Sequence, residues 1–573
     1  MTVAEYIIDF FIDNQVTDVF GYQGGMIAYL FEAMGKRQDK IQYHECATEQ
    51  GVALAACGYA QATGKMGIAL TTSGPGFTNL ITGMVNAWFD SIPLICISGQ
   101  VNTKDKRRNL RVRQLGFQEI QAPKMAEGIT KKVFEIDNDT DIAGCMQEAW
   151  STAMEGRKGP VFLELPINIC RNEVDKRENW IYKEQDFCGS REQVKEYLQK
   201  LQQSRKPVMI AGAGIHQMGC EDTFRKMVEE LKIPVITTLP ALDLLPTDSE
   251  YRVGYLGGTA RREAGIVLSK TDCVLAIGTR LCAKSIGYDL PKFAPNAKLF
   301  RVDIDEAELE RSLKDNEVQI KADLRAVMDD LIMLAGSEYD AEQKKEWAEH
   351  CGKLKKILKN SDVTYGNIFV EKVTGLLPDN YNITLDVGNN MIYGAQSSVI
   401  KEHTRMFVSG GFGAMGYALP AAVGTTLGNG HPTCVITGDG GMQMNIQELN
   451  IIGRKQLPVK IIVLNNRALG HIKLFQKAYL QEHYFATDEA RGDYFSCDFT
   501  GIAEAYGIEG HRIGSVEELD NYRDVLTNNK PVLIELIYED CGLLPNIHGG
   551  CDCLTSGPQL DTQIIQAVRE LGF

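Results

Sequence analysis

The sequence predicts an α/β fold of three doubly wound domains, each built on a parallel sheet. The chain has 573 residues, and at roughly 100–200 residues per domain it should form three or four domains rather than one core. Short β-branched runs alternate with longer helical patterns in three segments, as they do in βαβ units. Several runs end in glycine, where a strand turns into a helix. We expect domains at residues 1–175, 190–340 and 362–560.

The expected elements follow the chain in order. The first domain should hold a helix over Val52–Ala62 and strands at Met66–Gly74, Ile92–Gln100 and Gly159–Pro166. A polar linker, Arg171–Ser190, leads to middle-domain strands at Lys206–Ile215, Ile233–Leu239, Asp272–Arg280 and Lys298–Asp305. A Lys/Glu-rich helix over Ala341–Lys359 precedes third-domain strands at Asn382–Gly388, Thr433–Gly441, Val459–Asn466 and Pro531–Ile537. The strand runs are short and rich in residues that favour extended backbone.

The overall charge excludes some classes of partner. The formal net charge is −15, and 44% of the residues are hydrophobic, as in globular proteins. An acidic surface repels phosphate backbones, so a nucleic-acid or anionic-membrane partner is disfavoured. No apolar run reaches the roughly 18–20 residues of a spanning helix. Acidic residues stand near the N-terminus where a secretory signal would be basic, so we expect a cytoplasmic protein without a membrane partner.

The 15 cysteines mostly stand singly in apolar surroundings. In a large cytoplasmic chain we expect them to be buried free thiols. Cys551 and Cys553 form a C-x-C pair for which a metal or redox role and plain thiols without such a role are both open. We favour the second, because no further ligand pair accompanies them.

A glycine-rich turn, GDGG at Gly438–Gly441, follows an apolar strand and precedes a helical pattern. Open α/β sheets bind ligands beyond the carboxyl ends of their strands. Glycines such as Gly440 and Gly441 let backbone N–H groups approach a phosphate, and the next helix adds its positive end. Tight strand–helix turns also need glycine for packing, so this motif alone leaves both explanations open.

A second motif at the neighbouring strand end favours the phosphate site. Asn466 ends the next strand run, so its amide oxygen should lie near the carboxylate of Asp439. One carboxylate, one amide and the carbonyl of Ala468 suit Mg²⁺, which takes few protein ligands together with phosphate oxygens and water. The alternative is a capping Asp and a turn Asn, each of which is common. The two motifs together favour the metal.

With these motifs in order, the chain resembles thiamine-diphosphate enzymes, and most closely the acetolactate synthase family. The GDG…NN pattern is similar to the thiamine-diphosphate signature. Further matching motifs are FGYQGG (Phe20–Gly25), ATEQGVALAACGYAQATGK (Ala47–Lys65), TSGPGFTNLITG (Thr72–Gly83), DSIPLICISGQV (Asp90–Val101), GFQE (Gly116–Glu119), ITKK (Ile129–Lys132), LDVGNN and GGFGAMGYALPAA (Gly410–Ala422). The resemblance implies a pyrimidine-binding first domain, a flavin-binding-like middle domain and a third domain that binds the pyrophosphate and Mg²⁺.

The resemblance also implies roles for single residues. Glu49 matches the glutamate that hydrogen-bonds N1′ of the pyrimidine; an apolar setting favours the protonated carboxyl that this role requires. Its alternative is a helix-start Glu on the positive dipole end. Met415 matches the apolar residue that bends the cofactor between its rings. The remaining expected cofactor contacts are Gly24, Gly25, Asn389, Asn390, Gly413, Gly440 and Gly441.

Two further expectations concern flavin and subunits. The middle domain resembles the family's FAD domain, but the family's Met-His-Gly reads Leu256-Gly257-Gly258 here, so a flavin-free domain is nearly as well supported. In this family the two halves of one site come from different subunits, and Glu49 and Asp439 lie in different domains. The resemblance therefore implies a homodimer or homotetramer.

The chain departs from the family where the acceptor substrate should bind. The family's acceptor-binding arginine reads Lys284, which keeps the charge and loses bidentate recognition. The family's tryptophan reads Phe475, and an ionisable His471 enters the pocket wall as a structural residue or a proton donor. The resemblance further assigns Phe117, Gln118 and Lys131 to the substrate channel, with Gln118 also counted as catalytic.

The segment Lys104–Arg113 has six basic residues and one acid. It is either a solvated, ion-paired face or a recognition site for a phosphorylated acceptor.

The leading functional hypothesis is decarboxylation of a 2-keto acid, with pyruvate as the expected donor, and carboligation of the two-carbon unit to a carbonyl acceptor. The alternatives are transfer to a keto-sugar nucleotide, simple decarboxylation, and a non-catalytic cofactor-binding subunit, which the presence of Glu49, Asp439 and Asn466 disfavours.

Overall fold

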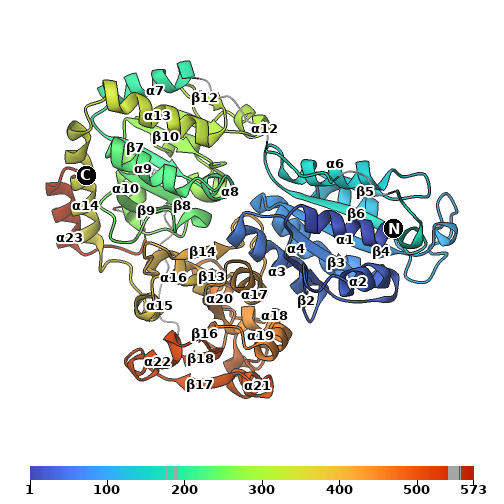
Figure 1. The fold of residues 1–573 in the computed structure, drawn as a ribbon. Helices are drawn as coiled ribbons and strands as arrows, with labels where there is room; N and C mark the ends of the chain where they lie inside the picture. Colours follow the sequence, from blue (N-terminus) through green and yellow to red (C-terminus); the bar gives the residue numbers. More distant parts are fainter. Residues whose placement is uncertain (176–178, 185–190, 540–553, 555–556) are drawn as a thin grey trace.

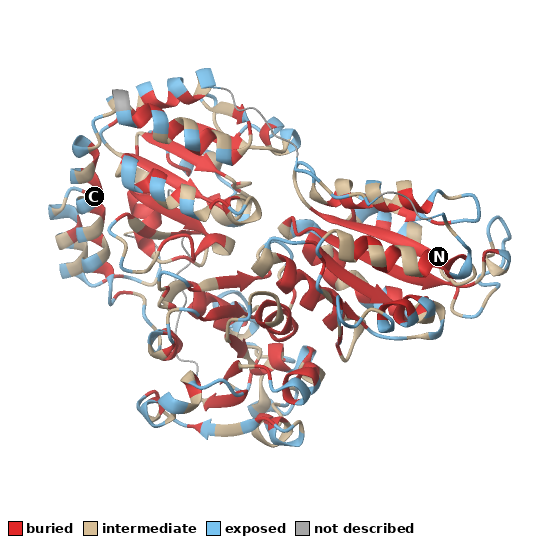
Figure 2. Cartoon of the chain, in the orientation of Figure 1, coloured by how far each residue is buried: buried red, intermediate tan, exposed pale blue. Residues whose placement is uncertain are grey.

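A computed structural model describes all residues except 176–178, 185–190, 540–553 and 555–556. It contains three six-stranded, all-parallel sheets, as the sequence predicts. Figure 1 shows the first domain in blue, the middle domain in green and the third in orange, grouped around a common centre. Figure 2 shows the sheets as the most buried layer, with the helices' inner faces packed on them. The domain limits proposed from the sequence stay predictions.

The first sheet has the order β2-β1-β3-β4-β6-β5. Its strands are β1 Asp18–Gly21, β2 Gln42–Glu45, β3 Gly67–Thr71, β4 Leu94–Gln100, β5 Lys132–Glu135 and β6 Pro160–Pro166. Its helices are α1 Val3–Asp13, α2 Ala28–Gly35, α3 Glu49–Thr63, α4 Pro75–Asp90, α5 Ala122–Ala126 and α6 Ile142–Met154.

The middle sheet has the order β12-β11-β10-β7-β8-β9, the arrangement of dinucleotide-binding sheets. Its strands are β7 Pro207–Ala211, β8 Val235–Thr238, β9 Arg252–Leu256, β10 Cys273–Ile277, β11 Lys298–Asp303 and β12 Val318–Lys321. Its helices are α7 Arg191–Gln203, α8 Gly214–Gln217, α9 Glu221–Leu231, α10 Arg262–Lys270, α11 Ala283–Ile286, α12 Glu306–Glu310, α13 Leu324–Glu338 and α14 Glu342–Leu358. The C-terminal helix α23, Thr562–Glu570, returns to this domain and packs on α14.

The third sheet, β14-β13-β15-β16-β18-β17, repeats the strand order of the first. Its strands are β13 Asn382–Leu385, β14 Arg405–Val408, β15 Thr433–Gly438, β16 Val459–Asn465, β17 Glu509–Ile513 and β18 Val532–Ile537. Its helices are α15 Tyr365–Leu376, α16 Asn389–Ser397, α17 Ala418–Asn429, α18 Asp439–Met444, α19 Leu449–Lys455, α20 Gly470–Tyr479, α21 Phe499–Ala505 and α22 Arg523–Thr527, and the short 3-10 helix η7, Ile446–Glu448, follows α18.

Helices α3 and α17 join the first and third domains through one apolar core. Small residues on both helices let their backbones approach closely: a Cβ on Gly424 would lie 1.8 Å from the carbonyl oxygen of Ala55, and one on Gly58 would lie 2.4 Å from that of Ala421. Since backbone atoms cannot move aside as a flexible side chain can, these glycines are required. The interface fixes the first domain against the third.

The described cysteines and helices agree with the expectations of free thiols and of no membrane-spanning helix. Cys57 and Cys96 are buried, and the cysteines of the described ranges are free thiols. Cys551 and Cys553 lie outside the described residues. None of the helices in the described part of the chain has the length and apolar character that a bilayer-spanning segment requires.

Candidate functional site

The carboxyl edge of the third sheet brings Asp439, Asn466 and Ala468 together. Asp439 follows β15 and Asn466 follows the neighbouring β16. The Asp439 side chain is 2% exposed and accepts a hydrogen bond of 3.0 Å from the Tyr494 hydroxyl. Burial raises the pKa of Asp439 to about 7. Among the described residues this buried carboxylate has no cationic partner, and beside an amide and a backbone carbonyl it fits a Mg²⁺ ion that would restore its negative charge.

The glycine turn beside Asp439 lies against Met415. A Cβ on Gly440 would lie 3.5 Å from Met415 Cε, which is van der Waals contact, and 2.8 Å from Leu469 Cδ2, so that leucine side chain would have to shift. Gly413, in the same loop as Met415, has a φ of +73°. This conformation suits glycine and shapes the loop that carries the methionine. Met415 and the glycine turn are therefore neighbours, as a cofactor that contacts both would require.

Asp386, to which the sequence analysis gave no role, ties these two loops together. It follows β13 as Asp439 follows β15, and it is buried. Its carboxylate accepts hydrogen bonds from the backbone N–H of Gly416 (2.9 Å) and Ala418 (3.0 Å), and a Cβ on Gly441 would lie 2.5 Å from it. Burial raises the pKa of Asp386 to about 6. An acid directly after an apolar strand was the signal that could have identified it.

The two asparagines at the start of α16 have different surroundings. The Asn390 side chain is buried and donates to the carbonyl oxygen of Asp386 at 2.5 Å, so it supports the strand end. Asn389 Oδ1 lies 3.3 Å from Nδ1 of His471. Burial and the charge of Lys284 both lower the pKa of His471. The structure thus brings His471 and Asn389 of the third domain into contact, and the charge of Lys284 in the middle domain acts on His471 from a distance.

Phe475 and Phe117 are both exposed, the latter by 78%. Phe475 is on α20, the helix that begins with Gly470-His471, and its ring packs against Tyr479 with 4.9 Å between centroids. Gln118 has a φ of +64° and lies against Gly74, where a Cβ would be 2.9 Å from the Gln118 carbonyl oxygen.

Glu49 begins α3 at the carboxyl edge of the first sheet. Thr48 caps the helix by accepting from the backbone N–H of Gly51, and Asn79 of α4 donates to Glu49 Oε2 at 3.0 Å. The Glu49 side chain is half-buried in the chain as described, so the apolar enclosure expected for it is incomplete there. A surface from elsewhere would have to complete it.

The neighbours of Glu49 fit a polar heterocycle. The hydroxyl oxygens of Thr71, which ends β3, and of Thr72 and Ser73, which follow it, are buried and find no hydrogen-bond partner in the described part of the chain. A Cβ on Gly24 would lie 2.6 Å from Thr72, whereas Gly25 is open. Unpaired buried hydroxyls are costly unless a ligand satisfies them. This edge therefore fits the pyrimidine of the cofactor.

Lys131 lies away from Glu49 and its neighbours. It precedes β5 and so lies at the amino edge of the first sheet, opposite Glu49, where it donates to the carbonyl oxygen of Glu155 at 2.6 Å. Burial lowers its pKa to about 8. Its position gives no support to the predicted contact with substrate.

Two of the six basic residues in the segment Lys104–Arg113 form ion pairs within their own domain. Lys106 contacts Glu135 and Glu164 at 2.5 Å each, and Arg108 lies 3.4 Å from Asp137. The ion-paired interpretation therefore describes these two residues. Arg111 and Arg113 are exposed and have no ion partner among the described residues.

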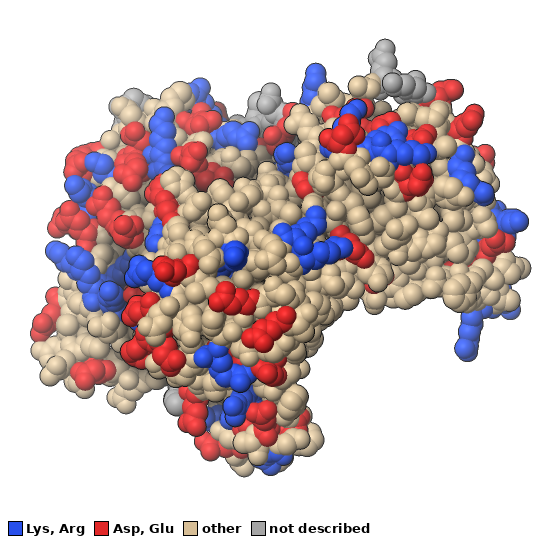
Figure 3. All heavy atoms as spheres, turned by 60° about the horizontal axis from the view of Figure 1, so that its bottom comes forward, with Lys and Arg blue, Asp and Glu red and all other residues tan. Residues whose placement is uncertain are grey.

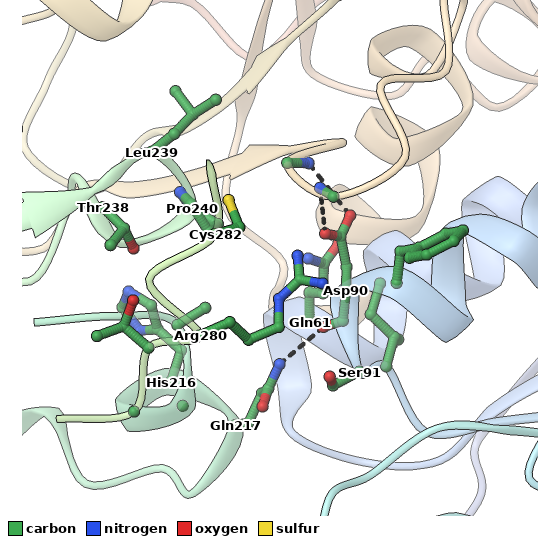
Figure 4. A pocket seen from close by; sticks show the side chains of 18 of the residues that line it. Gln61, Asp90, Ser91, His216, Gln217, Thr238, Leu239, Pro240, Arg280 and Cys282 are labelled. Atoms are coloured by element: carbon green, nitrogen blue, oxygen red, sulfur yellow. Dashed lines mark hydrogen bonds between the residues drawn. The ribbon is translucent and has the colours of Figure 1, made fainter. Parts of the chain in front are cut away.

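A large pocket opens at the carboxyl ends of the middle strands and is lined by all three domains. It holds about 1720 Å³, including space open to solvent. Figure 4 shows Arg280 of the middle domain reaching toward Asp90 of the first, whose backbone carbonyl accepts from Gln217 at 2.7 Å. Asp90 in turn accepts from the backbone N–H of Gly411 at 2.7 Å. The wall of the pocket includes Leu256, Gly257 and Gly258, which stand where the family has Met-His-Gly.

Comparison with known proteins assigns all three domains. Models described as thiamine pyrophosphate enzyme N-terminal TPP binding domain, central domain and C-terminal TPP binding domain match residues 1–125, 194–331 and 386–536. Acetolactate synthase isozyme 2 large subunit of Escherichia coli (strain K12) is 31% identical over 547 residues, which cover 94% of this chain and 96% of that protein. The acetolactate synthase large subunit of Lactococcus lactis subsp. lactis is 32% identical over 549 residues, covering 93% and 92%. The probable acetolactate synthase large subunit of Methanocaldococcus jannaschii is 32% identical over 571 residues, covering 96% and 94%.

The matched ranges contain both the glycine turn with Asp439 and the helix that begins at Glu49. The chain is therefore a thiamine-diphosphate-dependent enzyme of the acetolactate synthase family.

Proposed function

We propose that the enzyme decarboxylates a 2-keto acid, pyruvate being the expected donor, and joins the remaining two-carbon unit to a carbonyl acceptor. The observation that supports this most directly is the contact of His471 with Asn389 beside the cofactor-holding edge of the third sheet, where the charge of Lys284 still acts on the imidazole. A cation next to an imidazole can bind an acceptor's negative group and polarise its carbonyl.

The chain's own residues divide the work with the cofactor. Thiamine diphosphate, when bound, supplies the carbon nucleophile for the keto acid. Glu49 would hold a proton at N1′ of the pyrimidine, and Met415 would set the angle between the two rings. Asp439, Asn466 and the Ala468 carbonyl would hold Mg²⁺, while the backbone N–H groups of the glycine turn would bind the diphosphate.

The acceptor proposal predicts a selective effect of Lys284→Ala. We expect the acceptor KM to rise roughly 10- to 100-fold, as loss of a charged hydrogen bond does, while CO₂ release from pyruvate changes little. NMR identification of products over an acceptor panel, with Lys477→Ala on the exposed face of α20 as control, measures both. Loss of CO₂ release in parallel with carboligation would contradict an acceptor-specific role. No CO₂ release from any 2-keto acid by the unmodified enzyme would contradict the proposed function.

A keto-sugar nucleotide is the second candidate acceptor. The exposed Arg111 and Arg113, which stand before Phe117 and Gln118 in the same loop, support it because guanidinium groups bind phosphates well. The acceptor panel should include such a compound beside a second 2-keto acid.

We also propose that the pocket at the carboxyl ends of the middle-domain strands binds FAD. Gly212 and Gly278 lie at the ends of β7 and β10, where the strand order reverses, and a Cβ on Gly212 would meet the Gly278 carbonyl at 2.2 Å. Asp303, at the end of β11, could accept from ribose hydroxyls, and Arg280 could meet a diphosphate. The same glycines also serve the close approach of the two turns, so the proposal is supported by the pocket's place where the strand order reverses and by its polar groups.

Flavin binding predicts a yellow protein. The purified enzyme should show flavin absorbance and release FAD on heating, and Asp303→Ala should lower the flavin content several-fold by removing the ribose contact. Absorbance spectra with chromatography of the released cofactor measure this. A colourless enzyme that takes up no added FAD would contradict the proposal.

We propose that the active enzyme is a homodimer or a homotetramer whose sites form between subunits. Figure 3 shows a broad face with few charged groups around the hollow between the first and third domains. Large apolar side chains are exposed on both of these domains: Leu110, Val112, Leu115 and Phe117 in the first, and Met444, Ile472, Phe475 and Phe495 in the third. Exposed apolar area of this extent is typical of a subunit interface.

A further inference from the structure

Glu448 of the third domain contacts the first domain of the same chain directly before Glu49. It ends η7, on the segment that begins with Asp439, and its side chain is 0% exposed. No Lys or Arg in the described ranges pairs with it. Burial raises the pKa of Glu448 to about 7. A buried acid without a cation needs a structural or functional reason.

The partners of Glu448 are the residues directly before Glu49. Both carboxylate oxygens accept from the backbone N–H of Ala47 at 3.1 Å. Oε1 also accepts from the N–H of Thr48 at 3.2 Å and from its hydroxyl at 3.3 Å. Thr48 is the N-cap of α3, so the carboxylate of the third domain fixes the backbone from which the Glu49 side chain starts.

Gly51 gives an independent sign that this contact constrains the sequence. A Cβ on Gly51 would lie 2.1 Å from Glu448 Oε1. The carboxylate is held by its hydrogen bonds and cannot yield as a free side-chain end would. The first turn of α3 therefore leaves room for Glu448.

We propose that Glu448 is a positioning residue for Glu49: by holding the Ala47–Thr48 backbone, it sets the place and direction of the carboxyl that contacts the cofactor. The inference rests on the proposed role of Glu49 and concerns neither the donor nor the acceptor. Because Glu448 and Asp439 lie on one segment, the same stretch of the third domain presents the metal ligand and supports the first turn of α3.

The test is exchange of the C2 proton of bound thiamine diphosphate with deuterium, followed by acid quenching and NMR, at saturating Mg²⁺ and cofactor. This rate reports Glu49's action without any keto acid or acceptor. Glu448→Gln should slow the exchange about 10-fold and Glu448→Ala roughly 100-fold, because a displacement near 1 Å has effects of this size. Calorimetric cofactor affinity should stay within about threefold, since Asp439 and the glycine turn are intact.

Gly51→Ala supplies the matched steric variant. On its own it should slow exchange by pushing the carboxylate away, and in a Glu448→Ala background it should cause little further loss. Glu504→Gln, an exposed acid on α21, is the control and should exchange at the unmodified rate.

Unchanged exchange in Glu448→Gln, with its fold verified by circular dichroism, would overturn the proposal. This isosteric variant decides the matter if Glu448→Ala does not fold. Failure of the unmodified enzyme to accelerate exchange would instead contradict the role of Glu49, and a wrong acceptor would alter neither result.

Discussion

Glu49→Gln should lower turnover with pyruvate by at least about 100-fold, while the chain folds and still binds thiamine diphosphate. The change keeps the size of the side chain and removes its exchangeable carboxyl proton, and positioned proton transfer contributes about 10²–10⁴ in rate. Steady-state CO₂ release measures turnover, and calorimetry measures cofactor affinity. Asn79, which donates to Glu49 Oε2, offers a graded comparison.

In that comparison, Asn79→Ala removes one hydrogen bond to the carboxyl and leaves the carboxyl itself in place. We expect a loss of about 10-fold, as for one hydrogen bond to a charged group. Turnover of Glu49→Gln within about 10-fold of the unmodified enzyme would contradict the assigned proton role.

Asp439→Asn should weaken Mg²⁺-dependent binding of thiamine diphosphate by about 100-fold or more. The carboxylate is buried, so its charge interacts strongly with a bound cation, and breaking a buried ion pair has a cost of about 3–5 kcal/mol. Titrating cofactor into the apo-enzyme at several Mg²⁺ concentrations, with fluorescence or calorimetric detection, gives the affinity. Metal-independent affinity equal in the two proteins would show that Asp439 is not a ligand.

The two inactive variants together test where the sites form. A heterodimer purified through two different tags, with Glu49→Gln on one subunit and Asp439→Asn on the other, has one intact site if each site combines two subunits. It should then retain about half of the unmodified activity, as two-fold symmetry requires. An inactive heterodimer would place both residues of a site on the same chain and contradict the proposed subunit arrangement.

The inner strands of each sheet could be predicted from sequence far better than the outer ones. Runs such as Val459–Asn466 are apolar throughout because central parallel strands are covered on both faces. The strands that were not predicted include β2, β5, β9, β12, β14 and β17, which are the edges of the three sheets. Edge strands are short and partly polar; β2, for example, reads Gln-Tyr-His-Glu. Their pairing depends on neighbours distant in sequence, which a local pattern does not reveal.

The residues of the candidate site also differ in how far they could be predicted from the sequence. Asp439 and Asn466 could be placed at one edge because each follows a recognisable strand, and adjacent parallel strands end together. Asp386 and Glu448 received no role, since their partners are backbone amides in other loops or in another domain. Lys131 shows the converse: the motif match carried no information about which edge of the sheet the residue occupies, and its contact with substrate stays a prediction.

The close packing of α3 on α17 bears on how the protein is made. Their shared core contains residues of the first and third domains, yet the whole middle domain is synthesised between them. During synthesis, the apolar face of α3 therefore has no packing partner until α17, in the last third of the chain, has been made. In that interval the nascent chain exposes α3 to solvent and to chaperones. A first domain produced without the third domain would keep this hydrophobic surface exposed permanently.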